Sequence, residues 1–197
     1  AGITIWNFFA EVLTSTSNTF VTNASIFGKV YFPRLILPLS KVISGLIKFW
    51  IQFLLFAIAL IYFVIKGAPV HPSFLGILVV MPIVLFIMGG VGLGMGLILS
   101  ALTTKYRDLI FLITFGIQLG MYATPVIYPL SALSSKYKWI ILGNPLSSLV
   151  EAFRKVFLGV GELSSQGLLY SFCCMIVLMV VGIIIFNRVE KTFMDTV

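Results

Sequence analysis

The chain has 197 residues, of which 60% are hydrophobic and only 10% are charged, whereas a soluble domain carries about a quarter charged residues. A surface so poor in charge cannot stay hydrated, which excludes a soluble catalytic domain and indicates an integral membrane protein. The apolar runs are about 20 residues long and do not alternate with polar residues, which favours spanning helices over a barrel. The formal net charge of +7 comes from basic residues scattered between these runs, which is typical of anchors at anionic lipid headgroups. We therefore expect no nucleic-acid partner.

The sequence offers few groups for chemistry. Cys173 and Cys174 are adjacent, so on a helix they point about 100° apart and a mutual disulfide is not expected. The only histidine, His71, lies in a short polar loop and is typical of a solvated side chain. The six acidic residues form no obvious acid–base pair, and there is no phosphate-binding loop and no metal-ligand spacing. We predict that the chain has no catalytic residue and no metal or other cofactor of its own.

The energy for any uphill transport must then come from elsewhere. Proton relays usually use carboxylates in the middle of the membrane. Glu11, in the ambiguous first segment, is the one residue of this kind. This pattern favours an energising partner subunit over a self-sufficient ion-coupled carrier.

Residues 1–22 mix aromatic and aliphatic side chains with Ser and Thr, which is typical of a polar-lined membrane helix or of the end of one. The segment starts without an initiator Met, a basic leader or a cleavage motif. We therefore expect that an N-terminal part of the native protein is missing from this chain.

Residues 23–41 predict a short amphipathic helix at a membrane surface, followed by a broken turn. Asn23 fits an N-cap, and Pro33 and Pro38 are expected to stop a continuous helix. Lys29, Arg34 and Lys41 give the segment a basic character. One helical face collects apolar side chains, which are Ile26, Phe27, Val30 and Tyr31.

Two long apolar segments follow, at 42–65 and 74–102. The first is long enough to cross a bilayer with tilt, and Lys48 near its start is expected to snorkel to the interface. The second contains Pro82, which predicts a kink. Its glycines between positions 89 and 96 favour close helix packing over a nucleotide loop, because no strand precedes them.

The charged turn 103–108 leads into a short apolar segment at 109–123, and the last full span is predicted at 167–186. The positive-inside rule favours a cytoplasmic location for residues 23–41, for the turn and for the C-terminus. Residues 124–166 contain no full span.

A short amphipathic helix is predicted within 124–166. Asn144 and Pro145 fit its N-cap and first helical position, and Glu151 is expected to pair with Arg154 and Lys155 on its polar face. Two interpretations stay open: an interfacial helix, or a helix that dips into the membrane and returns as a pore mouth or gate. The predicted apolar stripe consists of Leu146, Leu149, Val150, Phe153 and Phe157.

Four sequence pieces occur in order: NASIFGKVYFPRLILPLSK, KYRDL, TPVIYPLSAL and GNPLSSLVEAFRKVFLG. With these pieces the chain resembles the permease subunit of ABC type 2 polysaccharide exporters. The closest similarity is to O-antigen (lipopolysaccharide) exporters, and teichoic acid exporters come next. The resemblance covers most of the chain from Asn23 onward.

The resemblance implies an all-α integral membrane protein, with about five spanning helices here and six in the family. A cytoplasmic coupling helix and re-entrant periplasmic gate helices are added to this bundle. Residues 1–197 would form a single transmembrane permease domain that lacks the family's N-terminal interface helix and first span. The coupling region would be 23–41 and the gate region 124–158.

The resemblance also implies an assembly. Two copies of the permease form a channel, and two separate ATPase subunits bind below it and hold ATP and Mg. The substrate is a lipid-linked polysaccharide, which is threaded outward across the inner membrane of a bacterial cell.

Candidate site residues follow from the same resemblance. The basic cytoplasmic candidates are Lys105 and Arg107, and Arg107 could act with Lys29 and Arg34 to attract the pyrophosphate of the lipid carrier. ATPase coupling is assigned to Ile26, Phe27, Lys29, Tyr31, Phe32, Pro33 and Arg34. The periplasmic gate is assigned to Thr124, Pro125, Tyr128, Pro129, Asn144, Pro145, Glu151 and Arg154. Rings on which sugar faces could stack are Trp6, Phe8, Phe9, Phe115, Tyr122 and Tyr128; for each, packing in lipid or anchoring at the interface is the alternative.

Other functions stay open at this point. The same class of permease also fits teichoic acid or capsular polysaccharide, or a drug or small lipid. A membrane-embedded enzyme would need polar catalytic residues clustered at one interface, and the sequence shows no such cluster. A passive channel or structural subunit is the last alternative.

Overall fold

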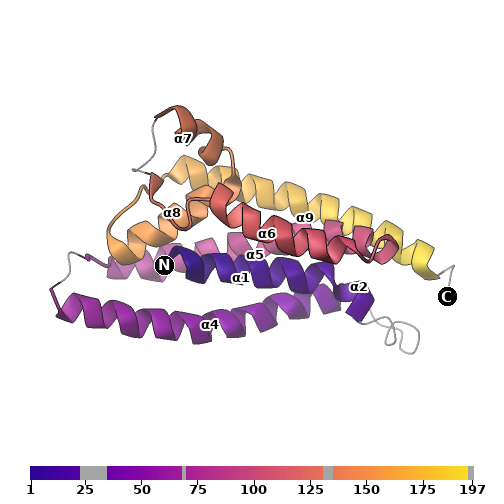
Figure 1. Ribbon diagram of the computed structural model, residues 1–197, viewed down its shortest axis with the longest axis horizontal. Helices are drawn as coiled ribbons and strands as arrows, with labels where there is room; N and C mark the ends of the chain where they lie inside the picture. The colour runs from indigo at the N-terminus through magenta and orange to yellow at the C-terminus, as the bar shows by residue number, and fades with distance from the viewer. Residues whose placement is uncertain (23–34, 68–69, 131–134, 195–197) are drawn as a thin grey trace.

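The computed structural model describes residues 1–22, 35–67, 70–130 and 135–194, and all regular structure in these residues is helical. Figure 1 shows α1, α4, α5, α6 and α9 running in the same general direction, with α7 and α8 gathered at one end and α2 and the end of α9 at the other. The helices are α1 (Gly2–Ser17), α2 (Thr19–Thr22), α4 (Ile36–Ile65), α5 (Phe74–Lys105), α6 (Leu109–Ala123), α7 (Ser135–Leu142), α8 (Pro145–Leu158) and α9 (Ser165–Met194).

Three of the described helices are long and apolar enough to cross a membrane, namely Ile36–Ile65, Phe74–Thr104 and Ser165–Val189. Their 25 to 31 residues exceed the roughly 20 that a bilayer core requires. The predicted all-α membrane architecture is therefore confirmed at this level. Helix α1 has 16 residues and α6 has 15, so the count of about five spans stays a prediction.

Helix α5 lies at the centre of the bundle, between α1 and α9, and its glycines make this possible. A Cβ atom added at Gly94 would lie 2.8 Å from the Leu178 carbonyl carbon of α9, and one at Gly92 would lie 3.1 Å from a Val12 methyl group of α1. From α9, a Cβ at Gly182 would lie 2.7 Å from the Gly94 carbonyl oxygen. The predicted close packing of small residues is confirmed, because only glycine lets the backbones approach this closely.

Aromatic side chains join the other helices to this core. Phe20 of α2 stacks on Phe186 of α9 with ring centroids 4.7 Å apart. Phe49, the buried ring of α4, meets Phe8 of α1 at 5.6 Å. The rest of α4 exposes large apolar side chains such as Leu55, 65% exposed, as expected of a helix surrounded by lipid.

Helix α4 begins earlier than the sequence predicts. It starts at Ile36 and continues through Pro38, so the expectation that Pro38 stops the helix is wrong. Pro38 lies in the first turn, where backbone N–H groups have no helical acceptor and a proline removes nothing. Residues 23–34 of the predicted coupling region, including Pro33 and Arg34, lie outside the described residues, and its residues 36–41 belong to α4.

Candidate functional site

Helix α8 begins as the sequence predicts. The Asn144 side chain accepts a hydrogen bond from the Leu146 N–H at 3.0 Å, and Pro145 occupies the first turn. The Asn144 amide also donates to the Thr124 hydroxyl at 2.9 Å. The N-cap is therefore confirmed, and it ties the start of α8 to the end of α6. The helix ends at Leu158 and is capped by Gly159, whose φ of 75° suits a residue without a Cβ atom.

Helix α8 is buried on more than its predicted apolar stripe. The stripe residues are at most 7% exposed and pack against the core: Leu146, Leu149, Val150, Phe153 and Phe157. The face predicted to be polar also lies inside the protein, because the side chains of Glu151 and Arg154 are only 2% and 9% exposed. These two residues pair as predicted, but Lys155 does not join them and donates to the Gly159 carbonyl oxygen at 3.1 Å instead.

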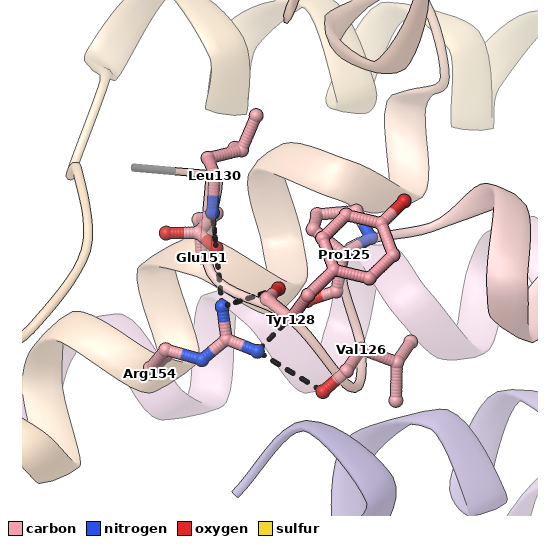
Figure 2. A network of polar contacts seen from close by, with 6 residues as sticks. All are labelled: Pro125, Val126, Tyr128, Leu130, Glu151 and Arg154. Atoms are coloured by element: carbon pink, nitrogen blue, oxygen red, sulfur yellow. Dashed lines mark hydrogen bonds and ion pairs between the residues drawn. The ribbon is translucent and has the colours of Figure 1, made fainter. Parts of the chain in front are cut away.

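Arg154 holds the loop that follows α6 (Figure 2). Its Nη2 atom donates to the carbonyl oxygens of Pro125 at 2.8 Å and Val126 at 3.0 Å, and its Nη1 atom donates to that of Tyr128 at 3.3 Å. Nη1 also forms the ion pair with Glu151. A planar guanidinium with several donors can satisfy this many acceptors at once, which a lysine ammonium cannot do in the same geometry.

Glu151 uses one of its two carboxylate oxygens in this network. Oε1 accepts from Arg154 and, at 3.4 Å, from the backbone N–H of Leu130. Oε2 is buried without a hydrogen-bond partner among the described residues. A Cβ atom added at Gly161 would lie 2.7 Å from it. The carboxylate therefore depends on Arg154 for most of its charge compensation.

Most of the residues assigned to the gate thus form one connected cluster. The Tyr128 hydroxyl donates to the Tyr122 carbonyl oxygen at 3.0 Å, which adds the last turn of α6. Pro129 is half-buried in the same loop. We call residues 124–130 together with α8 the gate segment. The sequence pattern left an interfacial helix and a gate open for this region, and the family resemblance assigned these residues to the gate.

A second site was missed by the sequence prediction. A groove of about 550 Å³ lies between α1, α4 and α6. Each of the three helices contributes polar side chains to the groove. Within a helix these residues are three or four positions apart, so they lie on one face. They are Asn7, Glu11 and Thr14 of α1, Lys48 and Gln52 of α4, and Thr114 and Gln118 of α6. We call this the polar groove.

An ion pair crosses the polar groove. The Lys48 ammonium lies 2.6 Å from Glu11 Oε1, and their side chains are 64% and 33% exposed. The same oxygen accepts from the Ser15 hydroxyl at 2.9 Å. The sequence did not predict this pairing of Lys48 with α1, and the expected position of Lys48 at the membrane interface stays a prediction. Ionisable residues within membrane helices commonly mark a transport path.

The predicted ring residues do not gather in one place. Trp6 and Phe8 are buried and line the polar groove. Phe9 contacts Trp6 at 5.2 Å between ring centroids and faces an apolar cavity of about 680 Å³ on the other side of α6. Phe115 and Tyr122 are 57% and 63% exposed, and neither lines one of these two cavities.

The remaining candidate residues are exposed or lie outside the described residues. Arg107 is exposed in the turn between α5 and α6, and the Lys105 side chain lies outside the described residues. His71 is exposed, as expected. Among the described residues, no three His, Cys, Asp or Glu side chains come together in a way that could hold a metal ion.

The described residues form an α-helical membrane protein with a groove between α1, α4 and α6 that is lined in part by polar side chains. A family model for the "ABC-2 type transporter" matches residues 1–158. The chain belongs to this family, which consists of membrane transport subunits and not of enzymes.

Three relatives are similar over most of this chain, and all are named O-antigen export system permease protein RfbA. Two are from Klebsiella pneumoniae, at 32% identity over 195 residues and 31% over 194; each comparison covers 98% of this chain and 72% of the relative. The third, from Myxococcus xanthus, is 26% identical over 158 residues, which are 79% of this chain and 58% of the relative. The resemblance inferred from the four sequence pieces is confirmed at the level of the family.

Proposed function

We propose that this chain is the channel-forming permease subunit of an ATP-driven exporter that moves a lipid-linked polysaccharide of the O-antigen class across the bacterial inner membrane. The observation that carries the proposal is the polar groove, because polar and ionisable side chains are costly within membrane helices and seven of them line this groove between three helices. The printed names of the relatives point in the same direction.

The chemistry of the polar groove suits a sugar chain. Amide and hydroxyl groups such as Gln52, Gln118 and Thr114 both donate and accept, so they exchange hydrogen bonds with successive sugar hydroxyls. Trp6 lines the same wall, with a side chain that is only 3% exposed and packs against Phe9. Many weak contacts of this kind let a polymer bind and slide without being trapped.

The charge of the polar groove favours an uncharged polymer over the alternatives. Its two charged residues, Glu11 and Lys48, neutralise each other at 2.6 Å. A phosphate-rich polymer such as teichoic acid would find no excess positive charge there. A drug or small lipid would fit better in an apolar pocket with few polar groups, such as the cavity of about 680 Å³ beside α6, than in the polar groove.

The gate segment would close one end of this path, on the periplasmic side. Asn144 fixes it to the end of α6 through Thr124, and Arg154 holds its loop through the carbonyl groups of Pro125 and Val126. Thr124 and Asn144 also line the apolar cavity beside α6. The assembly would contain about five spanning helices in this chain, a second copy of the chain and two ATPase subunits that bind ATP and Mg. Family membership implies the ATPase partner, and the chain itself would bind no nucleotide.

Contact with the ATPase would be made by the segment 23–34, which lies outside the described residues. We expect the pair of substitutions Phe27→Asp and Arg34→Glu to abolish co-purification of the ATPase. Retention of the ATPase by this variant would contradict the assignment of the coupling helix.

The proposed function can be tested in vesicles that contain the permease with its ATPase. Replacing Gln52 and Gln118 by Leu removes two hydrogen-bonding groups from the polar groove, and we expect export of lipid-linked glycan to fall by about tenfold. The matched variant with Asn at both positions keeps the amide groups and should retain most of the export. Equal export by both variants would contradict a sugar path in this groove.

A further inference from the structure

The loop held by Arg154 also lies against the first turn of α1. A Cβ atom added at Gly2 would collide with the Val126 carbonyl oxygen and would lie 3.3 Å from the Val126 Cα atom. Arg154 binds this same carbonyl oxygen from the other side at 3.0 Å. Val126, 4% exposed, is therefore held between the backbone of α1 and the guanidinium of α8.

Helix α1 is also a wall of the polar groove. Trp6 and Asn7 line the groove within two turns of Gly2, and Glu11 forms the ion pair with α4 one turn further on. Any widening of the groove by movement of α1 must therefore displace the backbone that touches Val126. A helix in the bundle moves as a stiff rod, because its packed neighbours do not deform continuously.

Residues 124–130 form no regular helix. Helical backbone hydrogen bonds therefore do not make this loop rigid. Side chains hold it instead: the Asn144–Thr124 hydrogen bond at one end and the fork of Arg154 along its length. Because Arg154 is 9% exposed and is compensated by Glu151, water does not compete for these hydrogen bonds. The fork makes the loop and α8 one rigid body.

We propose that Arg154 is a positioning residue that couples the gate segment to α1, so that the loop 124–130 and the first turn of α1 move together during the transport cycle. This inference rests on the proposed function, because it assigns a mechanical link between the polar groove and its gate. Arg154 contacts no substrate in this account and acts only through the loop carbonyl groups.

Spin labels can test the coupling in the assembled exporter. Ile3 of α1 and Ile127 of the loop are 54% and 55% exposed, so both accept a label after Cys173 and Cys174 are replaced by Ser. We expect dipolar broadening between the two labels to be the same without nucleotide and with vanadate-trapped Mg-ATP. In Arg154→Lys, which cannot span the three carbonyl groups, the broadening should fall in the trapped state.

The outcomes separate this inference from the proposed function. Loss of broadening on nucleotide trapping while Arg154 is present would overturn the coupling, and this measurement needs no Arg154 variant to fold. Unchanged broadening in Arg154→Lys in both states would also overturn it. Lys155→Arg, at the exposed neighbouring position, serves as the control and should behave as the wild type. If coupling holds but lipid-linked glycan never stimulates ATP hydrolysis, the proposed function fails and the mechanical link stands.

Discussion

The guanidinium of Arg154 meets the carboxylate of Glu151 inside α8, with both side chains nearly inaccessible. The two residues are three positions apart, a spacing that on most helices produces a solvated surface pair worth a few tenths of a kcal/mol. Here the pair is enclosed by the loop that follows α6, and the arginine gains three backbone carbonyl groups in return. The buried ion pair therefore also holds a segment of irregular backbone in place.

Replacing one partner of this ion pair should destabilise the protein more than replacing both partners. Arg154→Met leaves the Glu151 carboxylate buried without compensation, which costs about 3–5 kcal/mol. The double variant Glu151→Met/Arg154→Met should lose less, because no unpaired charge remains. Thermal unfolding in detergent micelles measures the difference. A double variant less stable than Arg154→Met would contradict the interpretation, and Lys155→Met should stay within about 0.5 kcal/mol of the wild type.

The approach of α5 to α9 predicts a contrast between two glycines. Gly94→Val places a side chain against the Leu178 backbone, so the helices must separate at a cost of about 1–3 kcal/mol. Gly116→Ala on α6 meets nothing within 4 Å and should be neutral or slightly stabilising, because alanine favours the helix. Unfolding midpoints of the two variants test this, and equal effects would argue against the close α5–α9 contact.

Asn144 has two separable roles that two substitutions distinguish. Asn144→Ala removes both the cap of α8 and the hydrogen bond to Thr124, and it should cost about 1–2 kcal/mol. Asn144→Asp keeps the acceptor for the Leu146 N–H and loses only the donor. We expect Asn144→Asp to fold nearly as well as the wild type while hydrogen exchange becomes faster in residues 125–130. Protection in this loop that is unchanged by both variants would show that the Thr124 contact is not needed.

The ion pair in the polar groove predicts a compensating double variant. Glu11→Gln or Lys48→Gln alone leaves one uncompensated charge in a path proposed for an uncharged polymer, and glycan export should fall. Glu11→Gln/Lys48→Gln restores neutrality and should export more than either single variant. Surface display of the glycan in cells reads out the result, with permease level as the control. A double variant that is no better than the worse single variant would show that charge balance is not what matters.

Local rules predicted the features that depend on neighbouring residues. The short helix at 109–123, the cap at Asn144 and the first turn at Pro145 follow from apolar runs, capping oxygens and the proline ring, and the structure has each of them. The glycines of α5 signalled close packing in the same way. Pro38 misled the prediction, because its effect depends on whether it stands inside a helix or in its first turn.

The site depends on contacts that no local pattern contains. Lys48 and Glu11 are 37 positions apart, and the carbonyl groups bound by Arg154 lie 26 to 29 positions away. The sequence pattern around Glu151 and Arg154 is the same for a surface pair and for a buried one, since burial is decided by the loop that covers them. The polar groove did leave a signal: polar residues one turn apart in apolar helices, such as Thr114 with Gln118 and Lys48 with Gln52, which mark a shared face.

In the proposed function, a sugar chain passes through the polar groove during ATP-driven export. A photo-crosslinking amino acid at Gln118, introduced into the permease within its assembled exporter, tests this directly during active export of lipid-linked glycan. We expect the glycan to be captured at position 118 when ATP is supplied, and not at Leu119, which is 53% exposed and lines neither cavity. Active export without capture at position 118, or equal capture at both positions, would contradict it.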